Sequence, residues 1–254
     1  MSLRTRPSGF SALELLVVIV SVVVLIALLL PMLGGSRRGG HRPMANNTQL
    51  RGIHQGFVTF AQSNKIGGND GFFPGLDGSG NVVSDGEATG HSGDGTHPGA
   101  RLWVLLEGNF FTPDYMINPA DFRAVEAETP PGSDDYEPIT ADHYSYALLG
   151  ILAEAERSEW KETLNTSAIV MGDRAVGTGP ADLSSVWTEA GSGDWRGGVV
   201  RNDNSASFET THRLEQTKYG GGVYNDWDDF FEDDPDTGDA YLVFRDAATA
   251  YSPD

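Results

Sequence analysis

Residues 9–14 read Gly-Phe-Ser-Ala-Leu-Glu, and from Leu15 to Leu33 the chain continues with the apolar run LLVVIVSVVVLIALLLPML. Only Ser21 and Pro31 interrupt this run. At about 1.5 Å per residue, a helix of this length spans roughly 28 Å, which is close to the thickness of a bilayer's hydrocarbon core. A segment in lipid must satisfy its own backbone hydrogen bonds, so the run predicts a transmembrane helix despite its many β-branched residues.

Glu14 places a carboxylate at the edge of the apolar run. Such a charge is costly and is expected to have a partner. A secretory signal peptide cleaved near residues 34–36 and an uncleaved membrane anchor are two alternatives, and neither gives Glu14 a role. Cleavage after Gly9 would free an α-amino group on Phe10. In a bundle of such helices, the amine of one subunit would then neutralise the Glu14 carboxylate of another and set the axial register.

The stretch GFSALELLVVI at residues 9–19 resembles the prepilin N-terminal cleavage and methylation motif, G-F-T-L-x-E-L-L-V-V-I. In that family a membrane aspartyl peptidase cuts after the glycine and N-methylates the new first residue. The resemblance therefore implies cleavage between Gly9 and Phe10 and methylation of Phe10. It also implies an assembly role for Glu14, and for Pro31 as the helix-kinking proline that is common in the family. The third and fourth motif positions carry Ser and Ala where Thr and Leu are usual.

Two further elements extend this resemblance. Residues 46–55 (NNTQLRGIHQ) and 72–75 (FFPG) are similar to the N-x-x-L-R-x-I and F-P-G elements of pilin-like proteins that are abundant in planctomycetes. The likeness covers the first 75 residues and, more weakly, a later hairpin. Together with the helix and strand patterns later in the chain, it predicts a loop-rich α+β fold, in which an N-terminal transmembrane helix is followed by a second helix that packs on a small antiparallel sheet.

The chain is expected to have four parts: a prepilin leader (1–9), the transmembrane and assembly helix (10–33), a Gly/Arg-rich hinge (34–43) and an extracytoplasmic globular domain (44–254). The hinge holds four glycines and one proline in ten residues, which disfavours a helix interior. Its arginines favour the cytoplasmic side, and those of the leader compete for the same side. The prepilin motif decides the orientation, with the globular domain outside the cytoplasm.

Within the globular domain, Leu50, Ile53, Phe57 and Phe60 fall at helical spacing and predict a second helix from Met44 to Asn64. Later apolar patterns predict a short helix, two buried strands, a hairpin and a closing strand, at residues 101–107, 144–149, 168–171, 195–211 and 241–244 respectively.

Composition excludes several classes of function. The net charge of −19 argues against a nucleic-acid partner, because phosphate binding needs a cationic surface. The chain has no cysteine, no G-x-S-x-G, no H-E-x-x-H and no Walker loop, so nothing specific indicates an enzyme. We expect His54 to be a packed or surface side chain, and His91 and His97 to lie in a solvated loop rather than at a metal.

The acidic segment 226–239 (DWDDFFEDDPDTGD) is the candidate site for a cation. Hard oxygen ligands around a glycine turn suit calcium, and pseudopilins carry a calcium site in a C-terminal loop, so the resemblance adds Asp234, Asp236 and Asp239 as possible ligands. These positions do not fit the EF-hand register. The alternative is a solvated acidic loop, and the aromatic residues inside the segment indicate that part of it packs down.

These observations lead to one hypothesis and two rivals. The hypothesis is a non-enzymatic pseudopilin in the inner membrane, assembled into a type II secretion-like pseudopilus or envelope filament. Its partners would be prepilin peptidase, other pilin-like subunits and membrane lipid. The first rival is a monomeric anchored binding protein for calcium, a cationic ligand or a polysaccharide. The second is a periplasmic enzyme behind a conventional signal peptide.

Overall fold

The computed structural model describes residues 12, 14–22, 38–65, 71–83, 95–232, 239–246 and 248–252. The chain divides into two compact units, Met1–His41 and Arg42–Asp254. In the first unit, residues 14–22 are helical. The apolar side chains of this stretch are between 47% and 59% exposed.

The predicted transmembrane helix is not found among the residues that the structure describes. No helix in the described part of the chain is both long enough and apolar enough to cross a membrane. Residues 23–33 of the predicted span lie outside the described residues. The expected fold class is therefore wrong about the transmembrane helix. It is also wrong about the sheet, which is larger than the small sheet that was expected.

Helix α2 (Arg38–Ser63) begins before the predicted Met44. The expected hinge over 34–43 is thus wrong for residues 38–43, which are helical with Pro43 inside the helix. A proline here removes one backbone hydrogen bond near the helix start. Most of the stability of a helix in a protein comes from burying one of its faces. In α2 the buried turns after Met44 therefore outweigh the hydrogen bond that is lost at Pro43.

A mixed α/β core is built on a five-stranded antiparallel sheet with the strand order β5-β4-β2-β1-β8, instead of the small sheet that was expected. The predicted strands and hairpin are confirmed within one or two residues. Every residue of the neighbouring β1 and β2 is buried, so both faces of the sheet centre are covered. The strands are β1 (Tyr146–Leu149), β2 (Ile169–Asp173), β4 (Gly197–Arg201), β5 (Ala206–Glu209) and β8 (Leu242–Val243).

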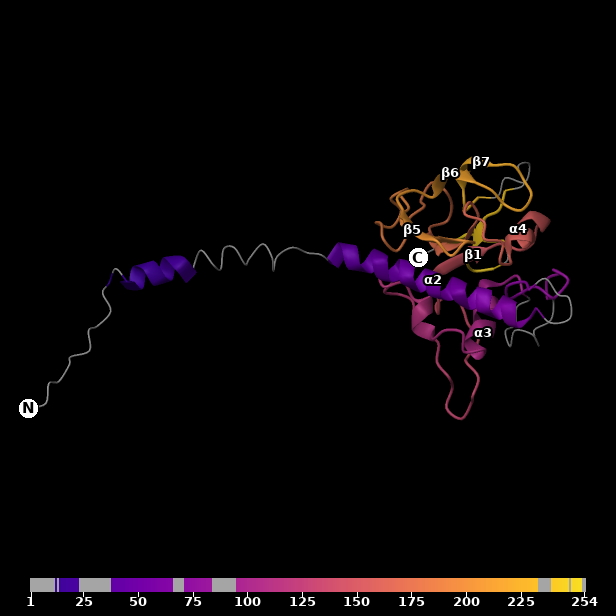
Figure 1. Ribbon diagram of the computed structural model, residues 1–254, viewed down its shortest axis with the longest axis horizontal. Coiled ribbons are helices and arrows are strands. Elements are labelled where there is room, and N and C mark those ends of the chain that lie inside the picture. The colour runs from indigo at the N-terminus through magenta and orange to yellow at the C-terminus, as the bar shows by residue number, and fades with distance from the viewer. Residues whose placement is uncertain are drawn as a thin grey trace, which may run out of the picture. The chain divides into compact units, whose positions relative to one another are not determined.

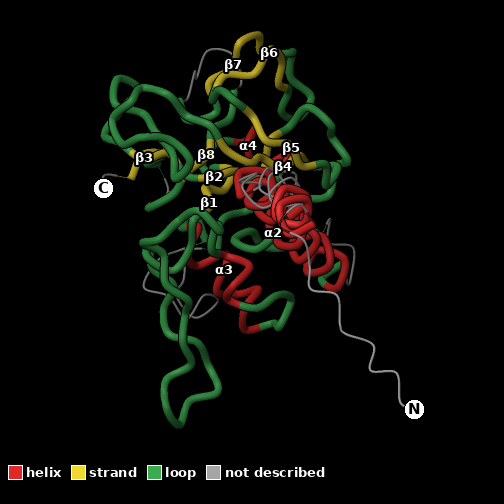
Figure 2. The backbone as a smooth tube through the Cα atoms, turned by 90° about the vertical axis from the view of Figure 1, so that its left-hand side faces the viewer, coloured by secondary structure: helices red, strands yellow, loops and turns green. Residues whose placement is uncertain are grey.

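Helix α2 supplies a large part of the core. Leu50, Ile53 and Phe57 are fully buried, and Phe60 is partly buried against the same cluster. The predicted apolar stripe of this helix is therefore confirmed. Figures 1 and 2 show α2 lying along one side of the sheet.

Shorter elements complete the second unit. The predicted helix at 101–107 is confirmed as α3, which lies on the same side of the sheet as α2, while a β6–β7 hairpin lies on the other side (Figures 1 and 2). A parallel pair, β3 with β9, stands apart from the main sheet. The bounds are α3 (Pro98–Glu107), η2 (Pro113–Met116), α4 (Glu154–Glu159), β3 (Ala175–Val176), β6 (Arg213–Thr217), β7 (Asn225–Asp229) and β9 (Tyr251–Ser252).

Candidate functional site

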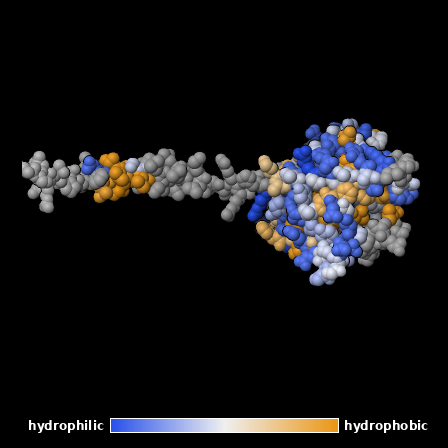
Figure 3. Space-filling view, turned by 60° about the horizontal axis from the view of Figure 1, so that its bottom comes forward, coloured by the Kyte–Doolittle hydropathy of each residue, from blue (hydrophilic) through white to orange (hydrophobic). Residues whose placement is uncertain are grey.

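The predicted processing site falls on the first unit. Gly9, Phe10 and Pro31 lie outside the described residues. Glu14 is exposed and belongs to the helical stretch 14–22, whose side chains are apolar except for Glu14 and Ser21. In Figure 3 these apolar side chains form a continuous hydrophobic segment, whereas the visible face of the second unit is largely hydrophilic. A helix that is apolar on all sides requires apolar surroundings.

In the second unit, the end of strand β2 holds a fully buried carboxylate, Asp173. Its Oδ2 accepts hydrogen bonds from Asn46 Nδ2 at 2.8 Å, Trp187 Nε1 at 2.7 Å and the Gly198 backbone N–H at 2.7 Å. Its Oδ1 accepts a fourth bond from Asn118 Nδ2 at 2.7 Å. Asp173 therefore ties together α2, β2, β4 and two loops.

Burial dominates the protonation of Asp173. Removal from water raises the pKa of its carboxyl to about 7, and the four hydrogen bonds act in the opposite direction. Burial also raises the pKa of Tyr146 well above its ordinary value, which keeps this neighbour a neutral hydroxyl. The cluster is thus a polar network around one titrating group near neutral pH.

Helix α2 is seated directly on the sheet through this network. The hydroxyl oxygen of Tyr146 in β1 lies 2.8 Å from Asn46 Oδ1 and 3.1 Å from Gln49 Oε1. A Cβ atom added to Gly198 in β4 would lie 2.6 Å from Asn46 Nδ2 and 2.7 Å from Leu50 Cδ1. Only a glycine leaves room for the helix at this distance.

The F-P-G element supports the other end of α2. Phe73 and Trp160 are fully buried, with their ring centroids 5.4 Å apart, and the Trp160 ring lies 5.1 Å from that of Phe57 in α2. Trp160 Nε1 donates a hydrogen bond to the Pro74 carbonyl at 2.7 Å. Gly75 has a φ of +100°, a conformation that favours glycine. This element therefore closes the aromatic part of the core.

His54 is a packed core residue, as expected. It is fully buried, and its Nδ1 lies 3.2 Å from Asn204 Oδ1 in the β4–β5 turn. Burial lowers the pKa of the imidazole to about 4, against weaker raising contributions from hydrogen bonds and nearby carboxylates. The ring is neutral at pH 7 and helps hold the hairpin turn to α2.

The predicted calcium ligands are only partly placed. Asp234 and Asp236 lie outside the described residues. Asp239 is buried, with its Oδ1 2.7 Å from the Ala240 N–H and 3.4 Å from Asn225 Nδ2. In the part of the chain that is described, no three His, Cys, Asp or Glu side chains are placed to hold a metal ion. A calcium site in this segment stays a prediction.

The aromatic residues of the acidic segment divide into two groups. Phe230 and Phe231 are buried, with ring centroids 5.1 Å and 5.5 Å from that of Trp195. Trp227 is 69% exposed and has a φ of +57°. The expectation that part of the segment packs down is confirmed: the two phenylalanines are buried, and the tryptophan belongs to the exposed part.

Sequence reasoning missed the Asp173 cluster. One signal was available, since Asp173 is a charged residue that directly follows the buried apolar run of β2. Asn46 belongs to the N-x-x-L-R-x-I resemblance, and nothing in the sequence joins it to Asn118, Trp187 or Gly198. The distances that unite these residues come from the sheet and its loops.

Comparison of the chain with protein-family models, with curated proteins and with solved structures finds no match.

Proposed function

We propose that this chain is a pilin-like structural subunit, a pseudopilin without enzymatic activity. It is held at the inner membrane through its apolar N-terminal region and displays its globular unit outside the cytoplasm. Prepilin peptidase matures it between Gly9 and Phe10. It then assembles with other pilin-like subunits into a type II secretion-like pseudopilus or related envelope filament.

One observation carries the proposal. The sequence G-F-x-x-x-E at residues 9–14 is followed immediately by a helical stretch that is apolar on every side apart from one serine. In water such a stretch leaves its side chains about half exposed, and packing against lipid or against like helices removes that unfavourable contact. Glu14 supplies the single charge that a new amine at Phe10 of another subunit would neutralise.

The seating of α2 supports the same function. In a subunit that assembles through its N-terminal region, any force on that region acts on the globular unit, so the attachment of α2 to the sheet has to withstand it. Asn46 and Leu50 fix α2 to β1, β2 and β4 through hydrogen bonds and close packing. A network of this kind resists sliding of the helix along the sheet, because each displaced donor would be left buried and unpaired.

The maturation step provides the direct test. We expect the mature chain to begin at Phe10 with an N-methyl group, when intact mass and N-terminal sequence are measured on protein from its native membrane. Gly9→Val should leave the chain uncut, because the cleavage position requires glycine in the motif that it resembles. Gly35→Val is the matched control and should be processed normally. A mature terminus near Ser36 would support a conventional signal peptide and contradict the proposal.

Assembly should depend on Glu14 independently of cleavage. We expect Glu14→Ala to be processed at Phe10 but to form crosslinks between tagged and untagged copies roughly tenfold less, since each 1.4 kcal/mol of lost pairing lowers an equilibrium constant tenfold. Glu126→Ala, which removes an exposed carboxylate from the second unit, serves as the control. Undiminished crosslinking of Glu14→Ala would show that the carboxylate does not pair between subunits.

A further inference from the structure

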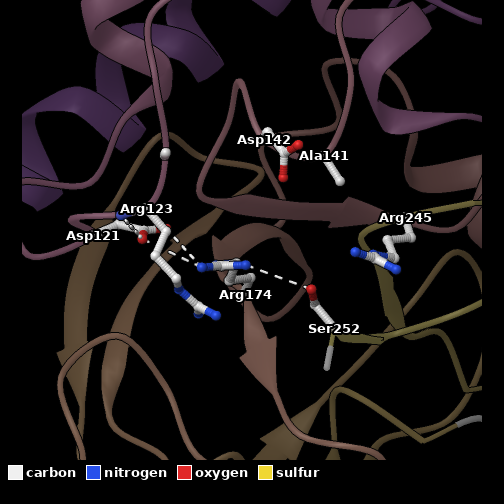
Figure 4. A pocket seen from close by; sticks show the side chains of 8 residues that line it. Asp121, Arg123, Ala141, Asp142, Arg174, Arg245 and Ser252 are labelled. Carbon is white, nitrogen blue, oxygen red and sulfur yellow. Dashed lines mark hydrogen bonds and ion pairs between the residues drawn. The ribbon is translucent and has the colours of Figure 1, made fainter. Parts of the chain in front are cut away.

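A concave site of about 410 Å³ lies in the second unit. Three arginines line it, together with two carboxylates and one hydroxyl: Arg123, Arg174, Arg245, Asp121, Asp142 and Ser252. They come from separate segments, since Arg174 follows β2, Arg245 follows β8 and Ser252 belongs to β9. Figure 4 shows Arg174 between Asp121 and Ser252, with Arg123 on one side and Arg245 on the other.

Arg174 forms the rigid floor of this site. Its side chain is 7% exposed and pairs with Asp121 at 3.1 Å between Nη2 and Oδ2. Its guanidinium also lies 5.3 Å from the centre of the Phe244 ring, and its Nη1 is 3.5 Å from Ser252 Oγ. Ser145 donates a hydrogen bond to the same Asp121 carboxylate at 2.9 Å. These contacts fix the guanidinium before any ligand arrives.

The charge of the site is opposite to that of the chain. Three guanidinium groups face two carboxylates, so the lining is net positive in a protein whose net charge is −19. Concave surfaces concentrate the field of their own charges and raise the local concentration of counter-ions. Guanidinium groups match carboxylate and other oxyanions in geometry through paired N–H donors. The site therefore favours an anion.

We propose that this cavity binds a carboxylate that carries neighbouring hydroxyl groups, as in an acidic sugar. Arg123 and Arg245 are exposed on opposite sides of the fixed Arg174, and they would attract the carboxylate into the cavity. Asp142, also exposed, would accept hydrogen bonds from the hydroxyl groups. The volume lies at the lower end of the range for small-molecule sites and suits one sugar unit rather than a long segment of polymer.

This inference goes beyond the proposed assembly function and does not depend on it. It concerns only residues of the globular unit, and a subunit with this site would recognise acidic saccharide whether or not it is built into a filament. The two proposals can fail separately, because processing at Phe10 and sugar binding are measured in different assays.

Titration calorimetry of the full-length chain in a non-ionic detergent tests the site. We expect sodium D-glucuronate to bind, and D-glucose, which lacks the carboxylate, to give no binding. Sodium sulfate at matched ionic strength should bind at least tenfold more weakly, because it presents no hydroxyl groups to Asp142. Arg123→Gln and Arg245→Gln should each weaken glucuronate binding at least tenfold.

Arg196→Gln removes an exposed arginine outside the cavity and should bind glucuronate like the unmodified chain. Circular dichroism and melting curves establish that the glutamine variants remain folded. Absence of glucuronate binding would overturn the proposal, as would full binding by both cavity variants. Equal binding of sulfate and glucuronate would overturn the assignment to an acidic sugar.

Discussion

Asp173→Ala should lower the free energy of unfolding of the globular unit by about 3–5 kcal/mol, because it leaves buried donors without an acceptor. The carboxylate receives hydrogen bonds from Asn46, Asn118, Trp187 and the Gly198 backbone, and all of these meet inside the core. Water cannot replace the lost acceptor without opening the contact between α2 and the sheet. The loss should appear as a decrease in melting temperature of roughly 6–20 °C for a unit of this size.

Asp134→Ala is the matched control, because it removes an exposed carboxylate from a loop. It should change the free energy of unfolding by less than about 0.5 kcal/mol. Chemical denaturation of the full-length chain, followed by the fluorescence of its buried tryptophans, measures both variants. Similar midpoints for Asp173→Ala and Asp134→Ala would mean that the Asp173 network does not hold α2 to the sheet.

Asp173→Asn isolates the effect of protonation. Burial raises the pKa of Asp173 from an ordinary 3.8 to about 7, so the folded state binds a proton that the unfolded state has released. This contribution to stability is fully present below about pH 4 and is lost as the pH rises through 7. The free energy of unfolding of the unmodified chain, minus that of Asp173→Asn, should therefore fall by roughly 2–3 kcal/mol between pH 5 and pH 8. A difference that is constant with pH would contradict the raised pKa.

Trp160→Ala should cost about 3–5 kcal/mol, since it removes the largest side chain of the aromatic cluster and leaves a cavity. The Trp160 ring packs against Phe57 and Phe73, and the Arg101 guanidinium lies 4.7 Å from its centre. The substitution also leaves the Pro74 carbonyl without its indole donor. Denaturant midpoints should fall without a large change in slope, because the same core still unfolds in one step.

Trp227→Ala provides the matched control, since this indole is 69% exposed. It should change the free energy of unfolding by less than about 0.5 kcal/mol. A loss at Trp227 as large as that at Trp160 would show that burial does not decide the stability of these side chains.

The elements that could be predicted are those whose pattern is local. The stripe of Leu50, Ile53 and Phe57 repeats with the helical period, and the runs that became β1 and β2 are continuously apolar because both of their faces are covered. Asn202-Asp203-Asn204 marks the turn between β4 and β5 through residues that tolerate left-handed backbone angles, and Asn204 has a φ of +64°.

The predictions that were wrong depended on the low helix propensity of a few residues or on the length of one apolar run. The hinge glycines and Pro43 predicted a break before Met44. Helix α2 nevertheless includes Gly39, Gly40 and Pro43, because packing of its later turns on the sheet outweighs local propensity. The apolar run from Leu15 predicted a complete transmembrane helix, and no helix of the described residues is long and apolar enough to cross a membrane. The sheet order could not be read from any single segment, since it places β8 beside β1 and β4 beside β2.

The candidate sites differ in the same way. The processing motif is contiguous and could be predicted, and it stays untested by the described residues. The Asp173 network and the arginine-lined cavity each draw on segments that are far apart in sequence, and their residues carry no common spacing. Residue spacing in the sequence therefore could not predict either site, because their residues come together only when the sheet has folded.

The distance along the chain between Asn46 and Asp173 has a consequence for biosynthesis. These partners are separated by 127 residues, so the helix is complete long before its acceptor leaves the ribosome. Protein synthesis adds about 5–20 residues per second. The side chains of Leu50, Ile53 and Phe57 in α2 are therefore exposed for on the order of ten seconds before β2 is synthesised. During that interval the nascent chain offers an apolar face to chaperones, and to the same face of a chain on a neighbouring ribosome.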